Sequence, residues 1–171
     1  DAAYHPMAEV NRALALFELD RFDEALALVD GVLAADPANA RATFQHGRIM
    51  LRRGRLDEAK ADFERVLAAY PRDRVTLQQL GELYKQRREF DSARKCFESI
   101  LAIDPEDTGA HYNLMLIYRK LGMKDDAARM ERVFVDQKDD PAATARASGF
   151  LRANPAMSNE TVPWHVHQAP Q

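Results

Sequence analysis

The sequence predicts an all-α fold, a solenoid of about four helix pairs. Residue types recur with a period of 34 residues, which the prolines Pro37, Pro71 and Pro105 mark most clearly. Within each period, apolar residues follow the spacing of amphipathic helices. A composition with 46% hydrophobic residues, 30% charged residues and only 7 glycines is typical of a helical protein with a continuous core and not of a disordered chain.

Each period is interpreted as two helices joined by a tight turn. We expect the first helices at about residues 7–19, 40–53, 74–87 and 108–121. We expect the second helices at about residues 22–35, 56–69, 90–103 and 124–137. The three prolines end the second helices, because proline has no N–H and disfavours helical geometry in the residue before it.

The turns inside the helix pairs have recognisable residues. Gly54 and Gly122 follow two of the first helices, where a left-handed backbone costs glycine nothing. Asp20 and Arg88 occupy the matching positions in the other two periods. Shortly after each turn comes an aspartate, namely Asp23, Asp57, Asp91 or Asp125. We expect these carboxylates to cap the second helices and to interact with the positive ends of their dipoles.

Small and apolar residues mark the interface within each pair. An alanine follows each aspartate by two residues, at Ala25, Ala59, Ala93 and Ala127. A methyl group at all four positions indicates close packing of the two helices. Four and seven residues after the alanines lie Val29 with Val32, Phe63 with Val66, Phe97 with Ile100, and Glu131 with Phe134. These residues form one apolar stripe, and Glu131 is its only polar interruption.

The repeat frame defines the expected domain boundaries. We place a repeat domain at residues 1–139, with repeats at about 6–39, 40–73, 74–107 and 108–139. Residues 140–153 are predicted to form a capping helix, because Pro141 suits a first helical position and a repeat stack must cover its last apolar face. Residues 154–171 have no helical period and are expected to be extended or partly disordered.

The recurring residues resemble the tetratricopeptide repeat (TPR). The third period carries Leu77, Leu80, Gly81, Tyr84, Ala93, Phe97 and Pro105, and the second carries Gly47, Ala59, Phe63 and Pro71. The first and fourth periods have Ala13 and Met115 at the glycine position. The resemblance implies a right-handed superhelix whose first helices line a concave groove that binds peptide segments or subunits of assemblies. It also implies a protein that is not an enzyme, and neither catalytic residues nor a cofactor is expected.

The expected groove lining is basic and rich in amides. Its candidate contact residues are Arg41, Gln45, Arg48, Arg52, Gln78, Gln79, Lys85, Tyr112, Asn113 and Arg119. Amides bond both donors and acceptors of an extended backbone, and arginines bond carboxylates through two N–H groups. The sequence therefore predicts a scaffold for an extended, acidic peptide or an assembly subunit. The alternative interpretation of these residues is a solvated polar face.

One branch of the family binds a terminal carboxylate through Lys, Asn and Arg side chains. This chain has Val10, Leu14, Gln45, Val75 and Gln79 at the matching positions, so that mode of binding is not expected.

Composition and charge limit the other classes of function. A net charge of −3 without a basic run disfavours nucleic acid as a partner. The single cysteine, Cys96, excludes an intrachain disulfide and is interpreted as structural. No apolar run reaches the length of about 18 residues that a membrane span needs. The chain begins at Asp1 without an initiator Met, which suggests a processed chain or a segment of a longer protein, so the compartment stays open.

Two alternatives concern the ends of the chain. His165 and His167 would face the same side of an extended strand and are the candidate metal ligands, although two histidines lack the other ligands of a zinc site. In that interpretation the chain is an accessory part of a larger metallo- or cytochrome-like enzyme. The second alternative is self-association through an uncapped end near Tyr4 and Met7.

Overall fold

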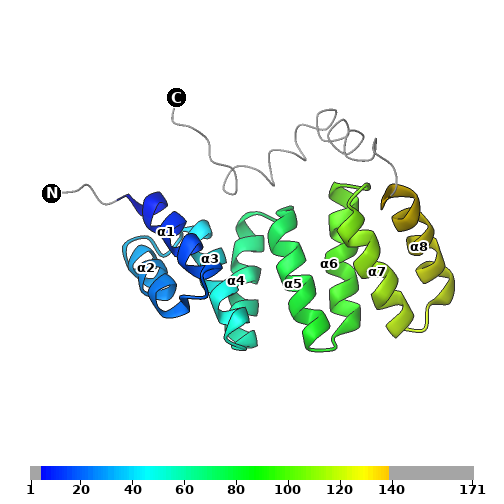
Figure 1. Cartoon of the computed structure of the whole chain (residues 1–171), viewed down its shortest axis with the longest axis horizontal. Coiled ribbons are helices and arrows are strands. Elements are labelled where there is room, and N and C mark those ends of the chain that lie inside the picture. The colour runs from blue at the N-terminus through cyan, green and yellow to red at the C-terminus, as the bar shows by residue number, and fades with distance from the viewer. Residues whose placement is uncertain (1–4, 139–171) are drawn as a thin grey trace, which may run out of the picture. The chain divides into compact units, whose positions relative to one another are not determined.

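The computed structural model describes residues 5–138 and is entirely helical over that range (Figure 1). The helices are α1 (Pro6–Glu18), α2 (Phe22–Ala35), α3 (Ala40–Arg52), α4 (Leu56–Ala69), α5 (Arg74–Gln86), α6 (Phe90–Ile103), α7 (Thr108–Lys120) and α8 (Lys124–Lys138). The predicted helices are confirmed to within one residue at each end. The predicted capping helix at 140–153 and the tail at 154–171 lie outside the described residues.

The chain falls into two compact units, Asp1–Ala69 and Tyr70–Gln171. Unit 1 contains the helix pairs α1/α2 and α3/α4, and unit 2 contains α5/α6 and α7/α8. The two helices of each pair are joined by a tight turn (Figure 1). The repeat domain predicted over residues 1–139 stays a prediction. No helix in the described range 5–138 has both the length and the apolarity to cross a membrane.

The core of each helix pair confirms the expected close packing. All four marker alanines are buried, and so are Phe63 and Phe97. Gly47 and Gly81 lie against these two rings. A Cβ atom on Gly81 would lie 2.7 Å from Cε2 of Phe97, and one on Gly47 would lie 2.8 Å from Cε1 of Phe63. Glycine is therefore required where the second helix carries phenylalanine.

The other two pairs relax this requirement. At the position of the phenylalanine, the first pair has Val29, and its glycine position holds Ala13; both residues are buried. In the fourth pair the exposed Glu131 replaces the ring, and the glycine position holds Met115, which is buried. The side chain on the first helix is thus larger where the one on the second helix fills less of the core, as close packing requires.

The turns confirm the prediction of a left-handed residue. Gly54 and Gly122 have φ values of 74° and 75°, and the non-glycine residues Asp20 and Arg88 have 57° and 60°. Only glycine adopts this region without a steric penalty, because it has no Cβ atom. Asp20 and Arg88 therefore carry backbone strain that Gly54 and Gly122 avoid.

The prediction that the aspartates cap the second helices is wrong for α2 and α6. In α2 and α6 the N-cap residues are Arg21 and Glu89, without a capping side-chain hydrogen bond, and Asp23 and Asp91 lie inside the first turn. There they face the positive end of the dipole, and they accept hydrogen bonds from Arg53 and Arg94.

The side-chain caps occur instead on three first helices. The residues that accept a backbone N–H are Asn39, Asp73 and Asp107. Each follows a repeat proline by two residues, and this spacing was the missed sequence pattern.

Candidate functional site

In unit 1, the face shared by α1 and α3 is occupied by Arg48. Its guanidinium group lies 4.2 Å from the centroid of the Phe17 ring. It donates hydrogen bonds to Glu18 over 3.0 Å and to Gln45 over 3.3 Å. Stacking on an aromatic face and pairing with a carboxylate both favour this position. Arg48 therefore fastens α3 to α1.

Arg52, one helical turn later, repeats the arrangement. Its guanidinium lies 5.7 Å from the Phe22 ring centroid and donates to the Asp20 carboxylate over 3.2 Å. We call the set of Phe17, Glu18, Asp20, Phe22, Arg48 and Arg52 the α1–α3 surface. Its positive and negative charges neutralise each other within the unit.

A second polar cluster of unit 1 surrounds His46. Its Nδ1 atom lies 2.5 Å from Oδ2 of Asp62, and its Nε2 atom lies 4.0 Å from Oδ1 of Asp30. The hydrogen bond with Asp62 raises the pKa of His46 above its usual 6.5, against the opposing effect of burial. Asp62 is also bonded by Arg65 over 3.3 Å, so the cluster joins α3 to α4.

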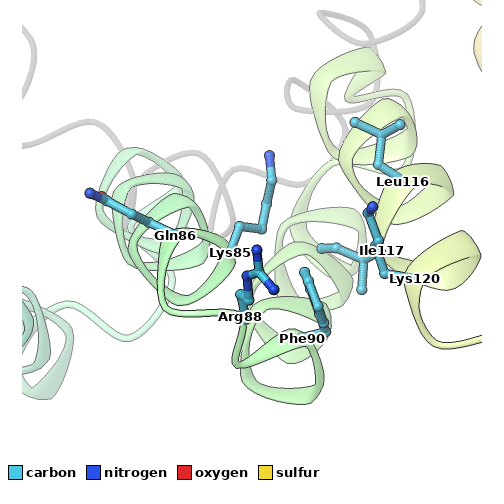
Figure 2. Close-up of a pocket in the computed structure, with 7 residues that line it drawn as sticks. All are labelled: Lys85, Gln86, Arg88, Phe90, Leu116, Ile117 and Lys120. Atoms are coloured by element: carbon cyan, nitrogen blue, oxygen red, sulfur yellow. The ribbon is translucent and has the colours of Figure 1, made fainter.

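Unit 2 has a cleft of about 450 Å³ on the equivalent face. Figure 2 shows side chains from the end of α5 and the start of α6 on one side of it, and side chains of α7 on the other. We call it the α5–α7 cleft, and its lining residues are Lys85, Gln86, Arg88, Phe90, Leu116, Ile117 and Lys120. Phe90, Leu116 and Ile117 are its apolar lining residues, and its polar lining consists of three cations and the amide of Gln86.

The cations of this cleft differ in their partners. Lys85 bonds the Glu82 carboxylate over 2.9 Å and also donates to Oδ1 of Asn113 on α7. Arg88 and Lys120 are exposed and form no ion pair or side-chain hydrogen bond with any residue in the range 5–138. No carboxylate is among the residues of the described range 5–138 that line the cleft. The arrangement can therefore accept negative groups from outside the described chain.

Comparison with known proteins identifies the repeat. Two family models, both described as tetratricopeptide repeat, match residues 10–74 and 50–115. The chain belongs to the tetratricopeptide-repeat family. Members of this family are typically scaffolds without catalytic activity, and this TPR protein is a protein-interaction scaffold. No curated protein sequence matches it significantly.

Solved structures of proteins named MamA share the fold. A structure titled "Crystal structure of MamA" is 17% identical over 79% of this chain and 79% of that one, with a TM-score of 0.73. A MamA RS-1 double mutant is 22% identical, covers 78% and 75%, and has a TM-score of 0.72. A fragment of MamA from Desulfovibrio magneticus RS-1 is 23% identical, covers 79% and 75%, and has a TM-score of 0.66. The all-α helix-pair fold is thereby confirmed.

The TPR frame also places the remaining candidate contacts of unit 1. Gln45 is only 6% exposed. Arg41 is half-buried and lines a hollow of about 290 Å³ with Pro6, Met7, Val10 and Asn39. No ion pair of Arg41 occurs among residues 5–138.

In unit 2, Asn113 is 8% exposed and Tyr112 is 43% exposed, with its ring 5.2 Å from that of Phe134. Arg119 pairs with Glu131 over 2.8 Å. Gln78 is exposed and Gln79 is half-buried.

The structure thus brings together only some of the candidates. Lys85 and Asn113 touch across α5 and α7, and Gln45 touches Arg48 in unit 1. Their contacts with a peptide stay predictions. Arg88 and Phe90 were missed as lining residues, because a turn residue and the first residue of a second helix were not expected on the groove. Comparing positions two repeats apart would have found them, since Asp20 is replaced there by Arg88.

No observation on residues 5–138 of the TPR protein supports the metal-site hypothesis. Within residues 5–138 no group of three or more His, Cys, Asp or Glu side chains is arranged to hold a metal ion. His165 and His167 lie outside this range. Cys96 is buried, as expected for a structural cysteine.

Proposed function

We propose that this protein is a non-enzymatic scaffold that binds an extended, acidic segment of a partner protein or assembly subunit on the faces of its first helices. The observation that carries the proposal is the charge of the α5–α7 cleft. Arg88 and Lys120 line it without an ion-pair partner among residues 5–138, while Lys85 lines it bonded to Glu82. Charge-assisted hydrogen bonds to carboxylates are about twice as strong as neutral ones. An acidic segment is therefore expected to gain more binding free energy at this cleft than a neutral one.

The neighbouring amides support an extended conformation of that segment. Gln78 on α5 is exposed and Gln79 is half-buried. An amide side chain offers both a donor and an acceptor, so it can pair with the N–H and C=O groups of a peptide backbone that makes no helix or sheet of its own. The repeats thus supply charge for the side chains of the partner and amides for its backbone.

Fluorescence anisotropy tests the proposal with two labelled peptides. One peptide alternates Glu with small residues, and the other has Gln in place of every Glu. We expect the Glu peptide to bind and the Gln peptide to bind at least about tenfold more weakly, because carboxylate contacts supply the affinity. Added salt should weaken the binding of the Glu peptide, because exposed charges are screened.

A matched pair of variants locates the interaction. Lys120→Glu reverses a charge in the cleft, and Lys124→Glu makes the same change at an exposed residue at the start of α8. We expect only Lys120→Glu to lower the affinity for the Glu peptide. Equal effects of both variants, or equal binding of both peptides, would contradict the proposal.

A further inference from the structure

The α5–α7 cleft and the α1–α3 surface occupy equivalent positions two repeats apart. Their aromatic residues Phe22 and Phe90 correspond, and so do the cations Arg52 and Lys120. The other positions differ in charge. Phe17, Glu18 and Asp20 are replaced by Lys85, Gln86 and Arg88, and Arg48 is replaced by Leu116. Unit 2 thus keeps the frame of the surface but lacks its carboxylates, its first guanidinium and the ring on which that guanidinium stacks.

These differences explain why unit 2 has a cleft there. In unit 1 the Arg48 side chain covers Phe17 and reaches Glu18, so that space is filled from within. In unit 2 the shorter Leu116 stands in place of Arg48, and Lys85, which bonds Glu82 and Asn113, stands in place of Phe17. Gln86 offers no charge to pair with. The missing parts are one large side chain and the carboxylates that flank it.

From this comparison we infer that the α5–α7 cleft binds a large apolar side chain, Leu or Phe, flanked by carboxylates in the partner segment. The inference rests on the proposed function and specifies the side chain by which the partner segment is anchored. A cleft of about 450 Å³ is large enough for one such side chain against Phe90, Leu116 and Ile117. Arg88 and Lys120 are exposed at its edge and take the flanking carboxylates. The α1–α3 surface carries its own counter-charges and does not take this anchor.

Three labelled peptides of equal length test the anchor on the full chain. Their centres are Glu-Leu-Glu, Glu-Ser-Glu and Gln-Leu-Gln within a Gly/Ser context. We expect the Glu-Leu-Glu peptide to bind the most tightly, and each of the other two to bind about tenfold or more weakly, because each loses either the buried side chain or the charge pairs.

A closing variant copies unit 1 into unit 2. Gln86→Glu combined with Leu116→Arg introduces the pair that Glu18 and Arg48 form naturally. We expect this variant to keep its Tm and to lose at least about tenfold in affinity for the Glu-Leu-Glu peptide. The control variant Lys124→Glu, at an exposed residue at the start of α8, should leave the affinity unchanged.

The outcomes separate the two proposals. If wild type binds neither the Glu-Leu-Glu nor the Glu-Ser-Glu peptide, the proposed function itself fails. If it binds both equally, or if the closing variant keeps full affinity, only the anchor inference is overturned. Should the closing variant not fold, Arg88→Glu decides, because this residue is exposed; an unchanged Kd would then overturn the inference. If a second copy of the chain occupies the cleft, the protein should form a dimer that Arg88→Glu abolishes. That result would also overturn the anchor inference.

Discussion

Unit 1 and unit 2 place different charges on the same helical frame. In unit 1, Arg48 and Arg52 lie over phenylalanine rings and pair with Glu18 and Asp20. In unit 2, the cations Arg88 and Lys120 face a cleft that no carboxylate lines. The difference shows how one repeat can be used for internal cohesion in one place and for recognition in another.

The comparison has an energetic basis. A guanidinium over an aromatic ring contributes about 0.5–2 kcal/mol, and an exposed ion pair contributes about 0–1 kcal/mol. Unit 1 gains this stabilisation within its own chain. Unit 2 leaves the equivalent positions open, so a ligand can supply the same kind of interaction as binding free energy. Stability and affinity are therefore expected to respond differently to equivalent substitutions.

The largest effect is expected in the core that both units share. Gly81→Ala places a Cβ atom 2.7 Å from Phe97, and overpacking of this kind costs about 1–3 kcal/mol of unfolding free energy. The combination Gly81→Ala with Phe97→Val reproduces the natural pair Ala13 and Val29. We expect the double variant to be more stable than the sum of the two single changes predicts, as measured by urea unfolding.

Gly47→Ala is the matched change in unit 1, where the nearest ring atom would lie 2.8 Å away. A similar loss of stability is expected. If alanine were tolerated at one glycine and not at the other, the two units would not share a packing rule. Equivalent surface positions in the two units could then not be compared residue by residue.

The next largest effect separates the surfaces. Arg48→Leu removes the stacking on Phe17 and the pair with Glu18, so we expect a loss of about 1 kcal/mol in unfolding free energy. Lys120→Leu in unit 2 removes a cation that has no ion-pair partner among residues 5–138 and should change stability by less than about 0.5 kcal/mol. Thermal unfolding followed by circular dichroism measures both. Equal losses would show that the cleft is internally paired after all.

The fold could be predicted from the sequence because its determinants are local and repeated. The prolines at positions 37, 71 and 105 follow the ends of second helices. The marker alanine is buried in every copy, and the phenylalanine position is buried in the first three. The missed caps are also local. Asn39, Asp73 and Asp107 share their spacing from the prolines, whereas the predicted caps, Asp23 and its equivalents, follow the turns inside the helix pairs.

The site could be predicted only in part, because charge pairing between repeats is not local. The sequence placed Arg48 and Arg52 on the first-helix face but did not show that Glu18 and Asp20, some 30 residues earlier, neutralise them. It likewise gave no sign that Arg88 and Phe90 line a cleft with α7. Which cations are left for a partner follows from side-chain positions across two repeats.

A smaller difference between the units is expected in how pH affects their stability. The pKa of His46 is raised in the folded state by the hydrogen bond with Asp62, so protonated His46 favours folding. This stabilisation is fully present below pH 6.5, the unperturbed pKa, and is lost as pH rises through the folded pKa. In unit 2 the equivalent positions hold Leu114 and Met130, which do not titrate and are buried.

Urea unfolding of wild type and His46→Gln over a range of pH values isolates this contribution from that of the other histidines. We expect the difference in unfolding free energy between the two proteins to shrink as pH rises above 6.5. A difference that stays constant across the range would show that His46 contributes packing and not charge.

The smallest effect is expected at the two strained turns, and it bears most directly on the comparison. Asp20 and Arg88 have φ values of 57° and 60°, where Gly54 and Gly122 occupy the other turns. Asp20→Gly and Arg88→Gly relieve the strain but give the unfolded chain more freedom, so a net gain of about 0.5 kcal/mol is the most that we expect for either. At Asp20 the lost pair with Arg52 reduces even that gain, whereas Arg88 has no internal partner among residues 5–138 to lose.

The two variants should differ in binding. Arg88→Gly removes a cation from the α5–α7 cleft, so we expect a higher Tm together with weaker binding of the Glu-Leu-Glu peptide. Asp20→Gly should leave that affinity unchanged, because its carboxylate belongs to the self-paired surface. Backbone strain that persists at a turn is explained if the side chain held there is useful. If Arg88→Gly gains stability and keeps full affinity, the strain at this turn has no role in recognition, and the inference that Arg88 takes a flanking carboxylate of the ligand is overturned.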